Sequence, residues 1–173
     1  MLRLLLLRHA NAERSRPGEG DVARRLTERG RSEAAELGAC MQTEGLTPDA
    51  TAVSPAARTR ETWELVAKAL ANAPEPASDD RLYDATPADI LKVIQDTPAK
   101  VGTLLVIGHN PGLHEFAASL VASGDRAARE RLNQGMPTSA LAVIDFTAKS
   151  WAELKSRTGR LERFVTPKRL AAD

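Results

Sequence analysis

The first residues of this sequence that could do chemistry are Arg8 and His9, which directly follow the apolar run Leu4–Leu7. A short apolar run of this kind predicts a buried strand that delivers both side chains to its carboxyl end. In open α/β sheets, ligands bind at that edge. An arginine can hold an oxyanion there, and an imidazole with a free nitrogen can attack it. The pair therefore indicates a site for an anionic substrate.

Two later junctions between a strand and a helix also carry a histidine or an arginine. His109 follows the apolar strand expected at 103–107, which glycines bound on both sides. Arg58 lies in the first turn of a helix that is expected to open at Ser54 and Pro55, with Ser54 as its cap. Free backbone N–H groups and the positive end of the helix dipole favour an anion there. If the sheet is parallel, these junctions share one edge and make a compact site for a tetrahedral dianion.

Strands and helices are expected to alternate along the chain. Strands are expected at about residues 4–7, 50–53, 103–107, 141–146 and 160–165, the last of them at a sheet edge. Helices are expected at about residues 28–44, 55–70, 87–94, 113–121 and 125–132. This alternation predicts that residues 1–173 form a single α/β domain of three α/β/α layers, with a mostly parallel central sheet.

Local signals mark two helix starts and two loops. Thr27 is a candidate N-cap, and Thr86 with Asp89 forms a variant of the capping box. The polar segment 11–25 has no periodicity and is expected to be a mobile loop above the carboxyl edge of the first strand. The Pro-rich segment 72–80 is also expected to be a loop.

Composition limits the classes of function. The formal net charge of +1 gives no reason to expect nucleic acid or an anionic membrane as the main partner. The only cysteine is Cys40, and the three histidines lack ligand spacing with carboxylates on one helix, so no metal site is expected. Because the apolar runs are far shorter than the ~20 residues of a membrane span, we expect a cytoplasmic protein.

Four motifs in order resemble those of the histidine phosphatase superfamily. They are Leu-Leu-Arg-His-Ala-Asn-Ala-Glu at 6–13, Arg-Leu-Thr-Glu-Arg-Gly at 25–30, Ser-Pro-Ala-Ala-Arg-Thr-Arg-Glu-Thr at 54–62 and Val-Ile-Gly-His-Asn-Pro at 106–111. The short chain and these motifs look most like the SixA-type phosphohistidine phosphatases. The resemblance implies a phosphoglycerate mutase-like fold and an enzyme that needs no metal or other cofactor.

The resemblance also implies a role for each residue of the pattern. His9 would be the nucleophile, and water would hydrolyse the phosphohistidine that it forms. Arg8, Arg58 and His109 would hold the phosphoryl oxygens and stabilise charge in the transition state. The second ring nitrogen of His9 is then expected to donate to a neighbouring backbone carbonyl.

The chain departs from larger relatives at the general acid, where those relatives place a Glu. The nearest equivalent is Asp84, which could be a shorter proton donor or a turn residue ahead of the next helix. Asn11, Arg24 and Thr138 are candidate contacts to the substrate phosphate, and each could equally be an ordinary loop or turn residue.

The favoured hypothesis is a metal-independent phosphatase that acts on a phosphohistidine carried by a protein, such as a phosphorelay or phosphocarrier protein. Alternatives are a phosphatase for a small phosphorylated molecule, a phosphoglycerate mutase-like enzyme and a non-catalytic module that binds a phospho-ligand. The absence of the Glu and of segments that would enclose a small bisphosphate speaks against the mutase. The presence of His9, Arg58 and His109 speaks against the non-catalytic module.

Overall fold

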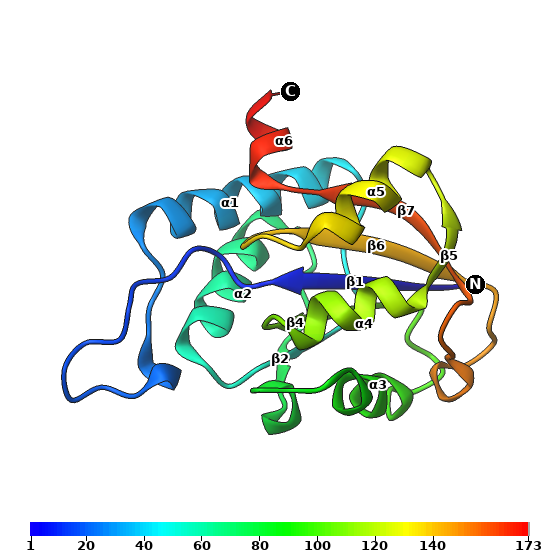
Figure 1. Cartoon of the computed structure of the whole chain (residues 1–173), viewed down its shortest axis with the longest axis horizontal. Coiled ribbons are helices and arrows are strands. Elements are labelled where there is room, and N and C mark those ends of the chain that lie inside the picture. Colours follow the sequence, from blue (N-terminus) through cyan, green and yellow to red (C-terminus); the bar gives the residue numbers. More distant parts are fainter. Residues whose placement is uncertain (173) are drawn as a thin grey trace.

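Strand β1 (Leu2–Arg8) lies in the middle of a seven-stranded sheet with the strand order β3-β2-β4-β1-β6-β7-β5 (Figure 1). The structure is a computed structural model and describes residues 1–172. The other strands are β2 (Ala50–Val53), β3 (Pro76–Ser78), β4 (Thr103–Gly108), β5 (Val121–Gly124), β6 (Leu141–Phe146) and β7 (Gly159–Val165). All neighbouring strands pair in parallel except β6, which is antiparallel to both β1 and β7. The predicted α/β fold with a mostly parallel sheet is confirmed.

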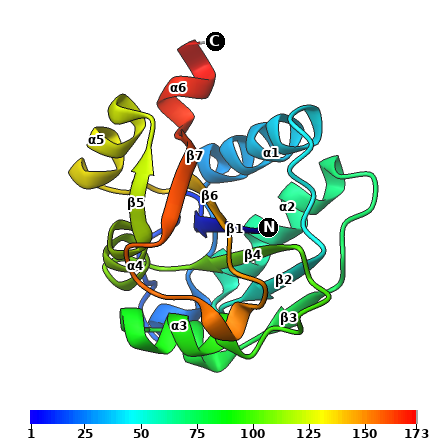
Figure 2. The ribbon, with the colours of Figure 1, turned by 90° about the vertical axis from the view of Figure 1, so that its right-hand side faces the viewer.

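Helices cover both faces of this sheet. They are α1 (Glu28–Thr43), α2 (Ala57–Ala69), α3 (Pro87–Gln95), α4 (Gly112–Leu120), α5 (Arg126–Gln134) and α6 (Pro167–Ala172). Figure 2 shows α1 and α2 on one side of the sheet, with α3, α4 and α5 on the other. Among the described residues, no helix combines the length and the apolar character needed to cross a membrane.

The leucine run of β1 is buried on both of its faces. Leu5 and Leu7 pack in the cluster that includes α1 and α2, whereas Leu4 and Leu6 pack in the cluster that includes α3 and α4. All four side chains have no exposed surface. A strand that is covered on both faces has apolar residues at successive positions, which explains why apolar and polar residues do not alternate in this segment.

Two helix starts follow their local signals, and a third does not. The Thr27 side chain accepts from the backbone N–H of Gly30, and Thr86 forms the reciprocal capping box with Asp89. The prediction that Ser54 caps α2 is wrong, because that helix begins at Ala57 with Ala56 at the N-cap position. The Ser54 hydroxyl is instead hydrogen-bonded to a histidine ring, which is described below.

The far edge of the sheet also differs from the prediction. The helix expected to run through Val121 ends at Leu120, and the next residues form β5 beside β7. The expected edge position of β7 is therefore wrong, since β5 covers it. At the opposite edge, part of the expected loop 72–80 forms the short strand β3, where Pro76 is tolerated because edge strands can lack a ladder donor. Both strands depend on pairing with distant segments, which local patterns do not encode.

Close backbone packing at Gly30 joins the start of α1 to the segment that follows His9. A Cβ atom at Gly30 would lie 2.0 Å from the carbonyl oxygen of Asn11. We therefore expect Gly30→Ala to lower the free energy of unfolding by about 2 kcal/mol, because the helix and the loop must move apart. Gly20→Ala is the control: its Cβ would meet nothing within 4 Å, and the expected change is within about 0.5 kcal/mol. Urea denaturation of both variants measures this difference, and equal losses would contradict it.

Candidate active site

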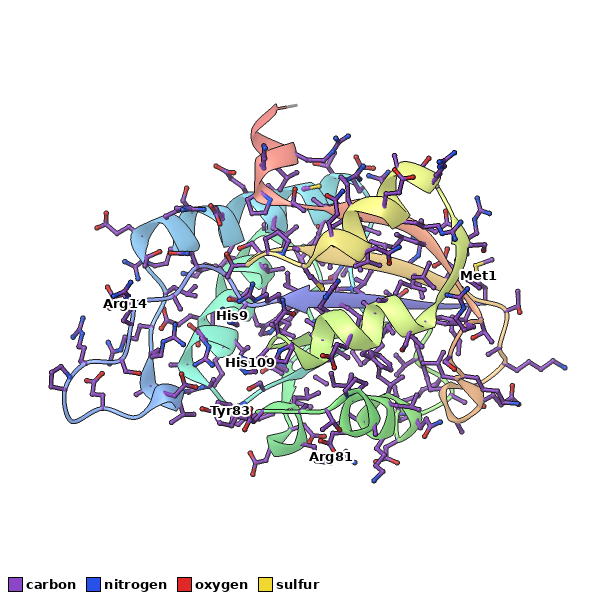
Figure 3. The ribbon with its side chains drawn as sticks, in the orientation of Figure 1. Met1, His9, Arg14, Arg81, Tyr83 and His109 are labelled. Atoms are coloured by element: carbon purple, nitrogen blue, oxygen red, sulfur yellow. The ribbon has the colours of Figure 1, made fainter. Side chains whose placement is uncertain are left out.

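Parallel pairing brings the ends of β1 and β4 to the same place. Arg8 lies opposite Gly108 in the register of the two strands, and the backbone N–H of His9 donates to the Gly108 carbonyl. The rings of His9 and His109 consequently lie with their centroids 5.3 Å apart. Figure 3 shows both side chains near the carboxyl end of β1. The predicted convergence of these residues on one sheet edge is what the structure shows.

His9 is buried and electrically neutral at pH 7. Its Nδ1 lies 2.7 Å from the carbonyl oxygen of Ala10, so this nitrogen carries the proton and donates it. Burial, together with the positive charges of Arg58 and Arg8, lowers the pKa of His9 to about 4. The donation to a neighbouring carbonyl was predicted from the sequence, and it leaves Nε2 with a free lone pair.

Helix α2 holds the backbone beside this ring. The backbone N–H of Ala10 donates to the Thr62 hydroxyl at 3.0 Å, and that hydroxyl donates to the carbonyl of Arg58 at 2.6 Å. Thr62 is fully buried. The position of the His9 ring is thus fixed by contacts to the same helix that supplies Arg58.

His109 is the second neutral imidazole of the site. Its Nε2 lies 2.7 Å from the hydroxyl oxygen of Ser54, and its Nδ1 is buried without a partner among the described residues. Burial, followed by the charge of Arg58, lowers the pKa of His109 to about 3. The buried Ser54 hydroxyl needs an acceptor for its hydrogen, and Nε2 provides one. With Nε2 accepting, the ring proton lies on Nδ1 and can be donated to an anion.

Arg58 is held by a residue that the sequence analysis missed. This arginine lies in the first turn of α2, as predicted, and is only 6% exposed. Its guanidinium donates to the backbone carbonyl of Asp21 at 2.9 Å and to the Asp21 carboxylate at 3.1 Å. The Tyr83 hydroxyl donates to the same carboxylate. No periodicity marks Asp21, because it reaches the site from the loop 11–25 through tertiary contacts alone.

Charge balance in this cluster is set by Asp21. The hydrogen bond from Tyr83, followed by those from Arg24 and Arg58, holds the pKa of Asp21 well below its usual range. Tyr83 also packs edge-on against the His109 ring, with centroids 5.5 Å apart (Figure 3). The carboxylate therefore remains charged at pH 7 and fixes the orientation of the arginine.

Arg8 supplies a second cation. Its Nη1 donates to the carbonyl of Met136 at 3.2 Å, while its Nε is buried without a partner among the described residues. Burial lowers the pKa of Arg8, and the charge of Arg58 lowers it further. Two guanidinium groups that repel each other are both stabilised when an anion binds close to them. Together with the two neutral imidazoles, they form a site suited to a phosphoryl group.

The remaining predicted residues lie around this cluster. Asp84 is exposed and has a φ of 55°, a left-handed conformation typical of a turn. The Asn11 side chain accepts from the Thr27 hydroxyl, and Arg24 donates to the carbonyl of Glu13 and to Asp21. Thr138 is half-buried in the turn before β6. Proton donation by Asp84 stays a prediction, as does contact with the substrate by the other three residues.

Among the described residues, no group of three or more His, Cys, Asp or Glu side chains could hold a metal ion. The positive charge of the site comes from its arginines.

Comparisons with known proteins agree with this geometry. Residues 4–88 match the model of the histidine phosphatase superfamily (branch 1). The uncharacterized protein Rv1276c of Mycobacterium tuberculosis is 32% identical over 164 residues, which cover 94% of this chain and 100% of that protein. The proposed phosphohistidine phosphatase SixA of Agrobacterium tumefaciens has a structure with a TM-score of 0.80 and 31% identity, covering 96% of this chain and 99% of the other. The proposed SixA of Nakamurella multipartitia has a TM-score of 0.83 and 27% identity, covering 96% of each chain.

The two neutral imidazoles lead to a testable pH dependence. Their pKa values in the folded protein, about 4 for His9 and about 3 for His109, lie below the ordinary value of 6.5. Protonation therefore favours the unfolded chain. The stability that these groups contribute is fully present above pH 6.5 and is lost as the pH falls toward 4 and 3.

NMR titration of the histidine Cε1–H signals from pH 7.5 to pH 5.5 tests whether either ring takes up a proton in this range. We expect the signals of His9 and His109 to stay those of neutral rings over this range. Arg58→Gln should raise both pKa values, because it removes a positive charge that lowers each of them. A midpoint near 6.5 for either ring in the parent protein would contradict this description of the site.

Proposed function

Because the chain belongs to the histidine phosphatase superfamily, we propose that it is a metal-independent phosphatase whose substrate is a phosphohistidine carried on a protein. The observation that carries this proposal is the state of His9. Its ring is neutral, its Nδ1 donates to a backbone carbonyl, and its Nε2 is free beside the buried Arg58 and the half-buried Arg8. A nucleophile for phosphorus needs this combination of a free lone pair and nearby positive charge.

The proposed reaction has two steps. His9 Nε2 attacks phosphorus in line, a new N–P bond forms, and the bond from phosphorus to the substrate imidazole breaks. Water then attacks the phosphohistidine on His9, which releases phosphate and restores the free ring. The net reaction consumes one water and returns unmodified histidine on the partner protein.

The cations and His109 act on the phosphoryl oxygens in both steps. Arg58 keeps N–H donors for the substrate, because its guanidinium carries more of them than Asp21 uses. His109 donates from Nδ1, because its Nε2 accepts from the Ser54 hydroxyl. Positive charge and donors fixed before the reaction stabilise the charge that develops on the oxygens of the transition state.

Among the described residues, no un-ionised carboxyl group is positioned in the cluster to donate a proton, and this supports a nitrogen leaving group. Asp21 is the carboxylate that the structure places in the cluster, and it stays ionised because its pKa is well below the usual range. Asp84 is exposed in a left-handed turn. An alkoxide leaving group needs a positioned acid, worth about 10²–10⁴ in rate, whereas an imidazole can be protonated by water on its second nitrogen.

The test compares kcat/KM for a histidine-phosphorylated protein with the values for phosphoserine and 3-phosphoglycerate. We expect the phosphohistidine to be preferred by at least about 10²-fold, because it needs no general acid from the enzyme. p-Nitrophenyl phosphate is the control for leaving-group quality and should be hydrolysed at a modest rate. His9→Ala should hydrolyse none of these compounds.

Preference for an alkyl ester would contradict the proposal. Asp84→Asn then distinguishes the cause: a loss of rate confined to alkyl esters would identify Asp84 as their proton donor.

A further inference from the structure

A pocket of about 810 Å³ opens beside the catalytic residues, between the segment that follows α5, the end of β7 and α6. Arg8 and Asn110, which neighbour His9 and His109 in the chain, line it, so it borders the candidate active site. Its other charged lining residues are Arg131, Lys168 and Arg169, and none of the described lining residues is acidic. We refer to it as the cationic pocket. Its composition favours an anionic ligand.

Backbone carbonyls, which carry no net charge, hold the three polar side chains deep in this pocket, those of Arg8, Asn110 and Arg131. Arg8 and Asn110 both donate to the carbonyl of Met136, at 3.2 and 2.8 Å, and Arg131 donates to the carbonyl of Phe164 at 3.2 Å. The Nε atoms of both arginines and Oδ1 of Asn110 are buried without partners among the described residues. These side chains are thus fixed in position while the charges of the arginines remain uncompensated.

The outer cations likewise form no ion pair with a carboxylate of the described residues. Lys168 and Arg169 are exposed on α6, which stands above the sheet in Figures 1 and 2. Neither residue, nor Arg8 or Arg131, takes part in any ion pair of the described residues, whereas some other surface arginines, such as Arg81 and Arg163, pair with Asp or Glu. Positive charge therefore extends from the outer rim of the pocket to Arg8 in the catalytic site.

We propose that the cationic pocket binds acidic side chains that flank the phosphohistidine on the partner protein. This inference rests on the proposed function and names the class of partner: a protein with an acidic surface around its phosphorylated histidine. A phosphohistidine side chain is short, so the partner surface must approach the rim that α6 forms. Acidic groups on that surface would then meet Lys168 and Arg169 first and Arg131 deeper in the pocket. Charge complementarity of this kind speeds encounter and selects partners.

The test uses two peptides that are phosphorylated on a single histidine by treatment with phosphoramidate. One carries Asp and Glu on both sides of the histidine, and the other carries Lys at the same positions. We expect the parent enzyme to have the higher kcat/KM for the acidic peptide. In Lys168→Glu/Arg169→Glu the ratio of the two kcat/KM values should fall at least about tenfold at low salt, and less at 0.5 M salt because of screening.

Lys149→Glu/Lys155→Glu is the matched control. It makes the same change in net charge at two exposed lysines that follow β6, near Phe146. Because Phe146 pairs with Leu2, these lysines lie at the opposite end of β1 from His9. The control should keep the peptide preference of the parent enzyme.

Three results would overturn the inference in distinguishable ways. Hydrolysis of both peptides without a charge preference would show that the cationic pocket does not recognise acidic groups on the partner. An equal fall in the kcat/KM ratio of the control variant would show the same. A raised KM for 3-phosphoglycerate in Lys168→Glu/Arg169→Glu, with an unchanged peptide ratio, would assign the pocket to small anions instead. Failure to hydrolyse either peptide would refute the proposed function itself.

Discussion

Parallel pairing of β1 with β4, with Arg8 opposite Gly108, brings His9 and His109 to one edge of the sheet. β6 pairs along the other side of β1, and helices cover both faces, so His9 follows a strand whose leucines at 4–7 are fully buried. The side chains that follow such a strand are themselves largely removed from water. Register and burial together decide which residues can cooperate and in which protonation state.

Burial then sets the chemistry of the site. Removing an imidazole from water disfavours its charged form, and the arginines add to this effect by repelling a second positive charge. The same arginines are held by carbonyl oxygens and by Asp21, not by contacts that would use all of their donors. The result is a neutral imidazole in a positively charged setting. An anionic phosphoryl group is the ligand that balances this arrangement.

Local patterns in the sequence were sufficient for the parts of the site that depend on strand ends and helix starts. The apolar run before Arg8 and His9, the strand before His109 and the placement of Arg58 in the first turn of α2 are examples. The roles of Asp21 and Tyr83 could not be predicted in this way, because their contact joins residues 62 positions apart. Ser54 has a strong local capping signal, but its hydroxyl bonds to His109, 55 residues away. The strand β5 likewise forms through pairing with β7 rather than through its own pattern.

Rapid-quench analysis with radiolabelled phosphoramidate tests the central claim that His9 is the nucleophile. We expect a phosphoryl-enzyme that is labile to acid and stable to base, with the label on His9 in peptide mapping. His9→Ala, shown to be folded by urea denaturation, should form none. An adduct that survives acid, or one formed equally by His9→Ala, would contradict the assignment of His9 as the nucleophile.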